Sequence, residues 1–150
     1  MSQTFRITTR FALYSRNARV NGGQMHCIYC GCDLDPNTAT LDHVVPRVRD
    51  GHNGPSNVVV ACGTCNSRKR NAPLSAFLRR SVAKRAWLEA ANFMPAGSTT
   101  AEVDAAAAVV ADEMVDEITA RVRAERRREI RRWAGRALAT MYGRTKVKAA

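Results

Sequence analysis

The apolar positions between residues 38 and 62 fall in two short runs. Both runs are rich in β-branched residues, at Thr38–Val45 and Val58–Val60, and a polar, turn-rich loop at residues 47–57 separates them. Runs of this length and composition are typical of strands. Pro46 ends the first run because proline cannot donate a ladder hydrogen bond. The pattern predicts a β-hairpin with an unusually long loop.

Beyond Pro73 the apolar residues recur every three or four positions, which is the period of a helix. A helix is predicted over residues 74–92, and the break at Met94–Ser98 is the clearest boundary in the chain. Thr99 and Glu102 have the spacing of a capping box that begins a second, long helix. The first helix buries Leu74, Phe77, Leu78, Val82 and Leu88. The second carries a stripe of Val103, Ala107, Val110, Met114, Ile118, Val122, Ile130, Trp133, Ala137 and Met141.

Residues 1–20 carry four arginines and no acid. Phe11 and Tyr14 lie three apart, which suits a short helix with one apolar edge facing inward. This segment is either a solvated lead-in or a DNA-contacting arm. Together these patterns predict a small α+β fold with helices flanking the hairpin. The predicted division of the chain is a basic lead-in at 1–23, a compact unit at 24–93, a linker at 94–98 and a helical basic extension at 99–150.

Composition narrows the class of protein. The chain has 150 residues and nine aromatic side chains, so its core is small and a metal ion would help to stabilise it. The net charge of +11 favours a polyanionic partner. No run approaches the roughly 20 apolar residues of a membrane span, and the N-terminus lacks the order of a secretory signal. We therefore expect a soluble, cytoplasmic protein with no membrane partner.

The charge is unevenly distributed. Residues 1–100 have a net charge of +8, residues 101–118 carry six acids and no base, and residues 119–150 have a net charge of +9. This order also suits the dipole of a long helix, so part of it has a purely structural explanation. The acidic stretch either packs on a basic surface of the same chain or contributes to pairing with a second copy.

Two C-x2-C pairs, Cys27/Cys30 and Cys62/Cys65, are separated by 31 residues. Five cysteines in a chain without a targeting signal argue against a disulfide framework. Four thiolates at this spacing instead predict one tetrahedral zinc site. Such a closed site is structural, because it leaves no position for water or substrate. The fifth thiol, Cys32, is interpreted as a bystander.

Asp42, His43 and Asn66 form a second candidate site. A carboxylate and an amide oxygen are hard ligands that suit Mg²⁺ or Mn²⁺. A neighbouring histidine can take a proton from water near neutral pH. Together such groups can hydrolyse a phosphodiester, with the ion stabilising charge on the phosphate and on the leaving oxygen. Each residue also has an ordinary explanation as a turn, cap or structural residue.

The pattern C-x2-C … D-H-x2-P … N-x4-C-x2-C-N-x2-K resembles the HNH endonuclease family of the ββα-metal finger superfamily. The resemblance covers residues 24–72, about a third of the chain. The third signature residue is Asn66 rather than histidine, a variant also found in the HNH domains of RNA-guided CRISPR nucleases. The matching residues are Cys27, Cys30, Asp42, His43, Pro46, Asn57, Cys62, Cys65, Asn66 and Lys69.

The resemblance implies roles for these residues. His43 corresponds to the general base, Asp42 and Asn66 to the ligands of the catalytic ion, and Asn57 to the residue that holds the hairpin loop and positions the histidine. Family behaviour implies 5′-phosphate and 3′-hydroxyl ends. The loop departs from the usual Gly-Gly, reading Asp50-Gly-His-Asn-Gly54, and His52 in it is interpreted as an exposed loop residue.

Several basic residues are candidates for phosphate contacts, which are independent of sequence and sensitive to salt. They are Arg47, Arg68, Lys69, Arg70, Arg127 and Arg131. A solvated helix face is the alternative for the arginines after residue 120. The leading hypothesis is a metal-dependent DNA endonuclease with structural zinc and catalytic Mg²⁺ or Mn²⁺. The alternatives are a zinc-stapled DNA-binding module without activity and an RNA substrate, with homodimer or larger assembly through the last helix left open.

Overall fold

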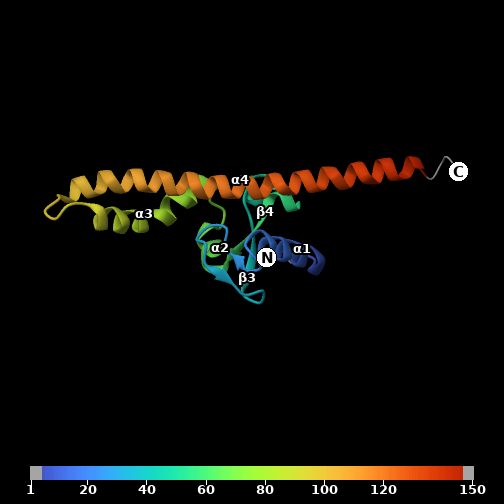
Figure 1. The fold of residues 1–150 in the computed structure, drawn as a ribbon, viewed down its shortest axis with the longest axis horizontal. Coiled ribbons are helices and arrows are strands. Elements are labelled where there is room, and N and C mark those ends of the chain that lie inside the picture. Colours follow the sequence, from blue (N-terminus) through green and yellow to red (C-terminus); the bar gives the residue numbers. More distant parts are fainter. Residues whose placement is uncertain (1–4, 147–150) are drawn as a thin grey trace.

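The computed structural model describes residues 5–146 and has an α+β architecture, as predicted (Figure 1). Its helices and strands follow one another along the chain in an order close to the predicted one. They are α1 (Ile7–Val20), β1 (Met25–His26), β2 (Asp33–Leu34), β3 (Ala39–His43), the 3-10 turns η1 (Arg47–Arg49) and η2 (Pro55–Asn57), β4 (Val58–Cys62), α2 (Gly63–Lys69), α3 (Leu74–Phe93) and α4 (Thr100–Lys146).

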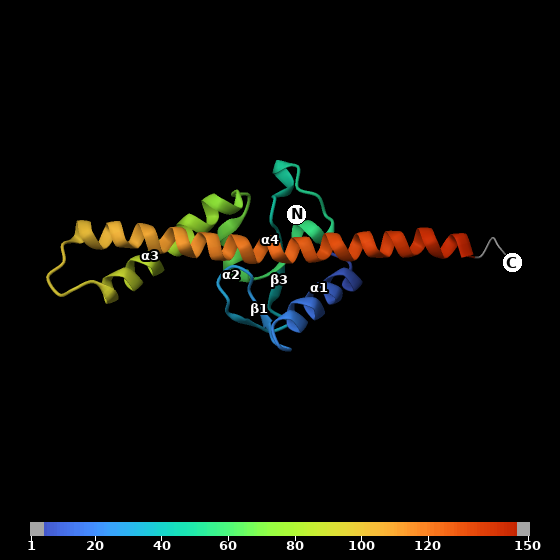
Figure 2. The same ribbon diagram turned by 45° about the horizontal axis from the view of Figure 1, so that its top comes forward.

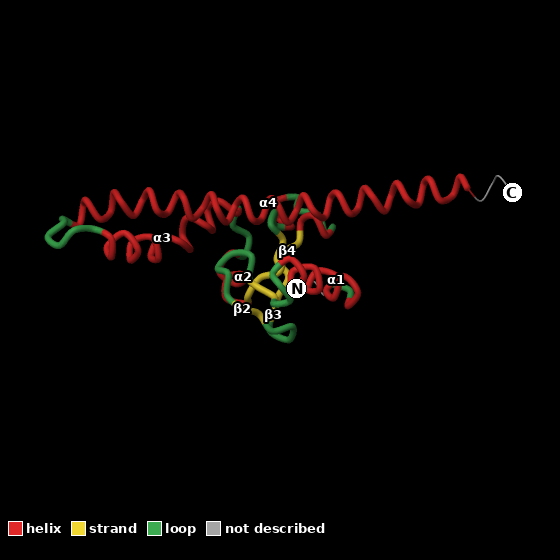
Figure 3. The backbone as a smooth tube through the Cα atoms, in the orientation of Figure 1, coloured by secondary structure: helices red, strands yellow, loops and turns green. Residues whose placement is uncertain are grey.

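The predicted hairpin is present as β3 and β4, which pair antiparallel with Ala39 opposite Cys62 and His43 opposite Val58. Strand β4 is buried from Val58 to Ala61 because α1, α2 and α4 all pack against it. A strand covered on both faces reads as a continuous apolar run. The tube in Figure 3 shows the strands, in yellow, gathered beneath the middle of α4 with α1 beside them.

A second, smaller hairpin of β1 and β2 precedes the first, and the sequence did not reveal it. Met25 pairs with Leu34 and His26 with Asp33. It is attached to α1 by the buried Asn17, whose amide nitrogen donates to His26 O at 3.0 Å and whose oxygen accepts from His26 N at 2.8 Å. The side-chain amide thus substitutes for a neighbouring strand and satisfies both backbone groups.

Helix α1 confirms the predicted short helix but not the predicted apolar edge. Tyr14 is buried beside Leu13, and its hydroxyl donates to Ala39 O, whereas Phe11 is 72% exposed. The inward face instead includes the polar residues Arg16 and Asn17. Both bind partners elsewhere in the chain, although Nη2 of Arg16 has no hydrogen-bond partner among the described residues. The pairing of polar groups across elements cannot be recognised in a pattern of apolar positions.

Helices α3 and α4 form an antiparallel helical hairpin over the first half of α4 (Figures 1 and 2). The capping box is confirmed, because Thr99 N donates to the Glu102 carboxylate at 2.7 Å and Glu102 N donates to Thr99 Oγ1 at 3.3 Å. Leu88 is exposed, contrary to prediction, because the small residues Ala86 and Ala90 form the contact face of α3. The acidic stretch of α4 lies along this basic helix, with Arg79 bound to Asp112.

The middle of α4 crosses the hairpin unit and completes its core. Val115, Ile118 and Val122 are buried in the same cluster as β4 and α1. The predicted apolar stripe ends there, because Glu125 and Glu129 are buried next, where both carboxylates bind Arg16 of α1. Ile130, Trp133 and Met141 are consequently exposed. No helix within the described range is long and apolar enough to cross a membrane.

Candidate functional site

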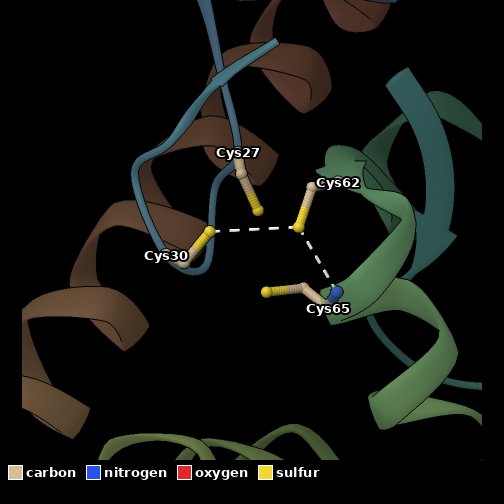
Figure 4. A group of neighbouring side chains, drawn as sticks. All are labelled: Cys27, Cys30, Cys62 and Cys65. Carbon is tan, nitrogen blue, oxygen red and sulfur yellow. Dashed lines mark hydrogen bonds between the residues drawn. The ribbon is translucent and has the colours of Figure 1, made fainter. Parts of the chain in front are cut away.

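The four cysteines of the two C-x2-C pairs come together at one point (Figure 4). Their sulfur atoms all lie within 4.8 Å of one another, and Cys30 Sγ is 3.9 Å from Cys62 Sγ. Zinc–sulfur bonds of about 2.3 Å in a tetrahedron separate the sulfurs by about 3.8 Å. The donor set and its spacing therefore fit one zinc ion.

The cluster joins the β1–β2 turn to the start of α2. Gly31, with φ 75°, allows the chain to turn after Cys30. Cys62 is the N-cap of α2, and its sulfur accepts from Cys65 N at 3.3 Å. Hydrogen bonding from the Cys65 thiol lowers the pKa of Cys27 to about 4, against the raising effect of burial. When bound, zinc would supply a covalent connection between these two segments.

Asp42 lies on β3 with its carboxylate turned into the protein, where it is almost fully buried. Lys69 of α2 places its Nζ 3.0 and 3.2 Å from the two carboxylate oxygens, and Tyr29 donates its hydroxyl to Asp42 Oδ2 at 2.5 Å. Burial raises the pKa of Asp42, and the neighbouring Lys69 ammonium opposes that shift. Burial also raises the pKa of Tyr29, so its hydroxyl stays a donor.

Asn66 lies one helical turn before Lys69 and contacts the same strand. Its Nδ2 donates to Thr40 Oγ1 at 3.1 Å and to Leu41 O at 3.3 Å. Thr40 Oγ1 in turn donates to Ala61 O, so it can only accept from Asn66. The amide orientation is thereby fixed, and Asn66 Oδ1, the atom that a hard cation would use, receives no hydrogen bond from the described residues.

His43 ends β3 and contacts the hairpin loop. Its Nε2 lies 2.8 Å from Asn53 Oδ1, and its ring packs against Phe5 with 5.3 Å between the ring centroids. Arg47 Nη1 donates to the same Asn53 oxygen at 2.9 Å. Asn53 Oδ1 is therefore an acceptor, so the proton of a neutral His43 lies on Nε2. The lone pair lies on Nδ1.

Asn57 is fully buried at the end of the loop, and its side chain makes three hydrogen bonds to the backbone of the loop. Its Oδ1 accepts from Val45 N at 3.0 Å, while its Nδ2 donates to Val45 O at 2.9 Å and to His52 O at 3.0 Å. Gly51 packs so closely that a Cβ there would lie 1.8 Å from Val45 O. These contacts fix the segment that follows His43.

The structure brings some of the predicted site residues together and separates others. Asp42, Asn66 and Lys69 all lie where α2 contacts β3. The side chain of His43 has different partners from that of its neighbour Asp42, because side chains alternate along a strand. Within residues 5–146, no hydrogen bond joins Asp42 to Asn66 or to the His43 ring.

The basic candidates also divide into two groups. Arg47, Arg68 and Arg70 are exposed around the loop and α2, and Arg127 and Arg131 are exposed on α4. Lys69 was expected at the surface but is buried: it is 1% exposed, and its Nζ binds Asp42 and His43 O. Lys69 therefore cannot contact a phosphate in this conformation.

Two contributors were missed in the sequence. Tyr29 lies inside the first C-x2-C pair, where only the cysteines carry a recognisable spacing. Asn53 lies in a loop rich in turn residues, where an asparagine is expected without any further role. In both cases the partner lies ten or more residues away, so no local signal could have identified the contact.

Comparison with known proteins bears on the same segment. Residues 27–81 match the family described as HNH endonuclease, and this range contains both cysteine pairs, Asp42, His43, Asn57 and Asn66. This segment belongs to the HNH endonuclease family. The likeness predicted from the residues is confirmed. The HNH segment, residues 27–81, contains the turn with Cys27 and Cys30, the β3–β4 hairpin, α2 and the start of α3.

Relatives of the HNH segment are found in much larger proteins. The CRISPR-associated endonuclease Cas9 of Actinomyces naeslundii is 36% identical over 55 residues, which are 36% of this chain and 5% of that protein. The Cas9 of Corynebacterium diphtheriae is 34% identical over 56 residues, 37% of this chain and again 5% of the relative. The crystal structure of the Type II-C Cas9 enzyme from Actinomyces naeslundii aligns with 81% of this chain and 12% of its own, at 21% identity and a TM-score of 0.41.

Proposed function

We propose that the protein is a metal-dependent DNA endonuclease of the HNH type that hydrolyses phosphodiester bonds. The observation that carries the proposal is the match of residues 27–81 to the HNH endonuclease family, with His43, Asp42, Asn57 and Asn66 all inside it. The exposed arginines around the loop and on α4 support a polyanionic substrate. The family resemblance implies products with 5′-phosphate and 3′-hydroxyl ends.

In this proposal His43 is the general base. Asn53 Oδ1 accepts a hydrogen bond from Nε2–H and thereby leaves Nδ1 to take a proton from the attacking water. Phe5 packs against the ring, and Asn57 fixes the backbone that follows it. The arrangement has the general form of a base oriented by a second group that binds its other nitrogen.

The catalytic ion is assigned to Asp42 and Asn66, which supply one carboxylate and one amide oxygen. Mg²⁺ or Mn²⁺ at these atoms would stabilise negative charge on the phosphate and on the leaving oxygen. The donor types fit a hard cation, but the Asp42 carboxylate is already bound by Lys69 and Tyr29. A divalent ion must therefore compete with the Lys69 ammonium for the same oxygens.

A plasmid-nicking assay with Mg²⁺ or Mn²⁺ tests the proposal. Wild type should convert supercoiled plasmid to the nicked form, and His43→Ala should be slower by about 10²–10⁴-fold, the contribution of a general base. His26→Ala is the matched control, because the His26 ring lies on the β1–β2 hairpin, where it contacts Asp33 and Gly31 O and no proposed reacting group. Equal rates for wild type and His43→Ala would overturn the proposal. Competition between DNA and RNA substrates then identifies the substrate class.

One observation favours a second function, that of a zinc-stapled DNA-binding module without nuclease activity. Lys69 already neutralises the buried Asp42 carboxylate, so this carboxylate needs no metal ion to be stable inside the protein. If wild type and His43→Ala bind DNA equally and neither nicks it with any divalent ion, the module is the correct function.

A further inference from the structure

A cleft of about 400 Å³ lies between the β3–β4 loop and the second half of α4. Its walls include His52 and Pro55 from the loop and Ile130, Trp133 and Arg136 from α4. Figure 2 shows that this loop and α4 lie next to each other at the centre of the molecule. Neither the family match nor the proposed chemistry accounts for the α4 side of the cleft, because residues 129–136 lie outside the HNH segment.

The apolar surface of the cleft is unusually open. Trp133 is 67% exposed and Ile130 is 53% exposed, although the helical spacing of both predicted packing against another element. The reason lies in α4 itself, because its inward face here consists of Glu125 and Glu129, which bind Arg16 of α1. An indole ring is thus presented to solvent beside the loop.

The charge around the cleft indicates what occupies it. Residues 121–136 of α4 carry eight arginines and two glutamates. Arg136 lines the cleft and forms no ion pair among the described residues, and the acid in the lining, Glu129, is already bound by Arg16 and Arg132. An apolar protein segment would gain nothing from this many arginines, whereas a nucleotide combines a flat apolar base with an anionic phosphate. Proteins that bind single strands use this combination of aromatic stacking platforms and a positive groove.

We propose that this cleft binds an unstacked nucleobase of a single-stranded segment of nucleic acid, with the base stacked on Trp133 and its flanking phosphates near the α4 arginines. The inference rests on the proposed function only in taking nucleic acid as the ligand. Asn53, which binds His43, and His52, which lines the cleft, are consecutive loop residues. The bound base therefore belongs to the strand that approaches His43, and the protein selects unpaired nucleotides near its cutting position.

Tryptophan fluorescence tests the proposal directly, because the chain has only two tryptophans. Trp87→Phe leaves Trp133 as the single emitter, and Trp133→Phe leaves Trp87, which lies on α3 and donates to Asp104. Each variant is titrated with a thymine oligomer of about 12 nucleotides, within the footprint of single-strand-binding grooves. The titration is done at low salt, with zinc and no other divalent ion. Quenching is expected in Trp87→Phe and not in Trp133→Phe.

Two comparisons separate base stacking from simple charge attraction. An abasic oligomer of the same length should bind more weakly and leave the Trp133 emission unchanged. Trp133→Ala should bind the thymine oligomer about 5- to 150-fold more weakly, the range for one base–aromatic stack, with an unchanged melting temperature because the side chain is exposed. Equal quenching by both oligomers, or equal affinity of Trp133→Ala and wild type, would overturn the inference.

The outcomes also separate this inference from the proposed function. If wild type binds the oligomer through Trp133 but nicks no plasmid, the cleft assignment stands and the nuclease assignment fails. If wild type nicks plasmid and Trp133→Ala binds the oligomer as tightly as wild type does, the nuclease assignment stands and the cleft assignment fails. If sedimentation shows that Trp133→Ala dissociates an oligomer of the chain without changing its affinity for DNA, a second copy occupies the cleft and the inference is wrong.

Discussion

At the residue scale, the proposed site depends on how Asp42 is neutralised. Its side chain is 6% exposed and that of Lys69 is fully buried, so each charge is stable inside the protein only because of the other. The ammonium occupies the carboxylate that a catalytic ion would need. Lys69 is therefore an internal competitor of the proposed ion, and removing it should expose the metal affinity of Asp42.

Lys69→Met tests this competition. We expect the variant to lose about 3–5 kcal/mol of stability without added Mg²⁺ or Mn²⁺, because the buried carboxylate has lost its counter-charge. Added Mn²⁺ should restore much of this loss by binding Asp42, whereas wild type should gain less. Thermal melting with zinc present throughout measures both effects. Identical responses of wild type and Lys69→Met to Mn²⁺ would show that Asp42 is not a metal ligand.

The double variant Asp42→Asn/Lys69→Met is the matched control. It removes both charges, so it should be more stable than Lys69→Met alone and should not respond to Mn²⁺. A response in the double variant would place the ion elsewhere.

Asn53 provides a second test at this scale. Asn53→Ala should reduce the nicking rate about 10- to 100-fold, the cost of losing an outer-shell partner that orients a reacting histidine. Asn53→Asp retains an acceptor oxygen and should keep most of the activity. The added carboxylate favours the imidazolium, so the acidic limb of its pH–rate profile should move to higher pH. Equal loss in both variants would mean that Asn53 acts only through loop structure.

At the element scale, the β3–β4 loop has one required conformation. Asn57 binds Val45 and His52, and Gly51 lies against Val45 O. Gly51→Ala should therefore destabilise the protein by about 1–3 kcal/mol and slow nicking, because the loop must move to admit the methyl group. Chemical denaturation and the nicking assay measure the two effects.

Gly135→Ala is the control for this substitution. Gly135 lies in α4 with no atom near its added Cβ, so alanine should stabilise the helix by up to about 1 kcal/mol. Normal activity and stability in Gly51→Ala would show that the loop is adaptable, and that the position of His43 does not depend on it.

Most elements could be predicted because their signals are local. The β-branched runs gave β3 and β4, Pro73 marked the start of α3, and the pair Thr99 and Glu102 marked the start of α4. The burial of Arg16 and Glu125 could not be predicted, because each is stable only through a partner 109 residues away. For the same reason Trp133 was wrongly predicted to be buried. On this part of α4, Glu125 and Glu129 face inward instead, because they bind Arg16.

In the candidate site, spacing identified the cysteines, and the family motif identified Asp42, His43, Asn57 and Asn66. The residues that bind these side chains could not be predicted in the same way. The motif includes Lys69 but gave no sign that its ammonium binds Asp42 inside the protein, and it placed this residue among the surface cations. Such contacts depend on how β3 packs against α2, which is a property of the folded chain.

At the scale of the whole molecule, α4 is part of the core as well as an extension. Val115, Ile118 and Val122 are buried with β4 and α1, and Arg16 binds both glutamates of the next turns. Burying three aliphatic side chains contributes roughly 5–9 kcal/mol to the free energy of unfolding. This is comparable with the total of about 5–15 kcal/mol for a small domain. A chain ending at Ser98 should therefore fail to fold cooperatively and should lose zinc. A chain ending at Gly135 keeps the three buried aliphatic residues and both glutamates that bind Arg16, so it should fold. Circular dichroism melting and a zinc-release assay on the two truncated chains check this expectation. A stable, zinc-loaded chain of residues 1–98 would show that the HNH segment folds without α4, and that α4 serves only to bind the substrate.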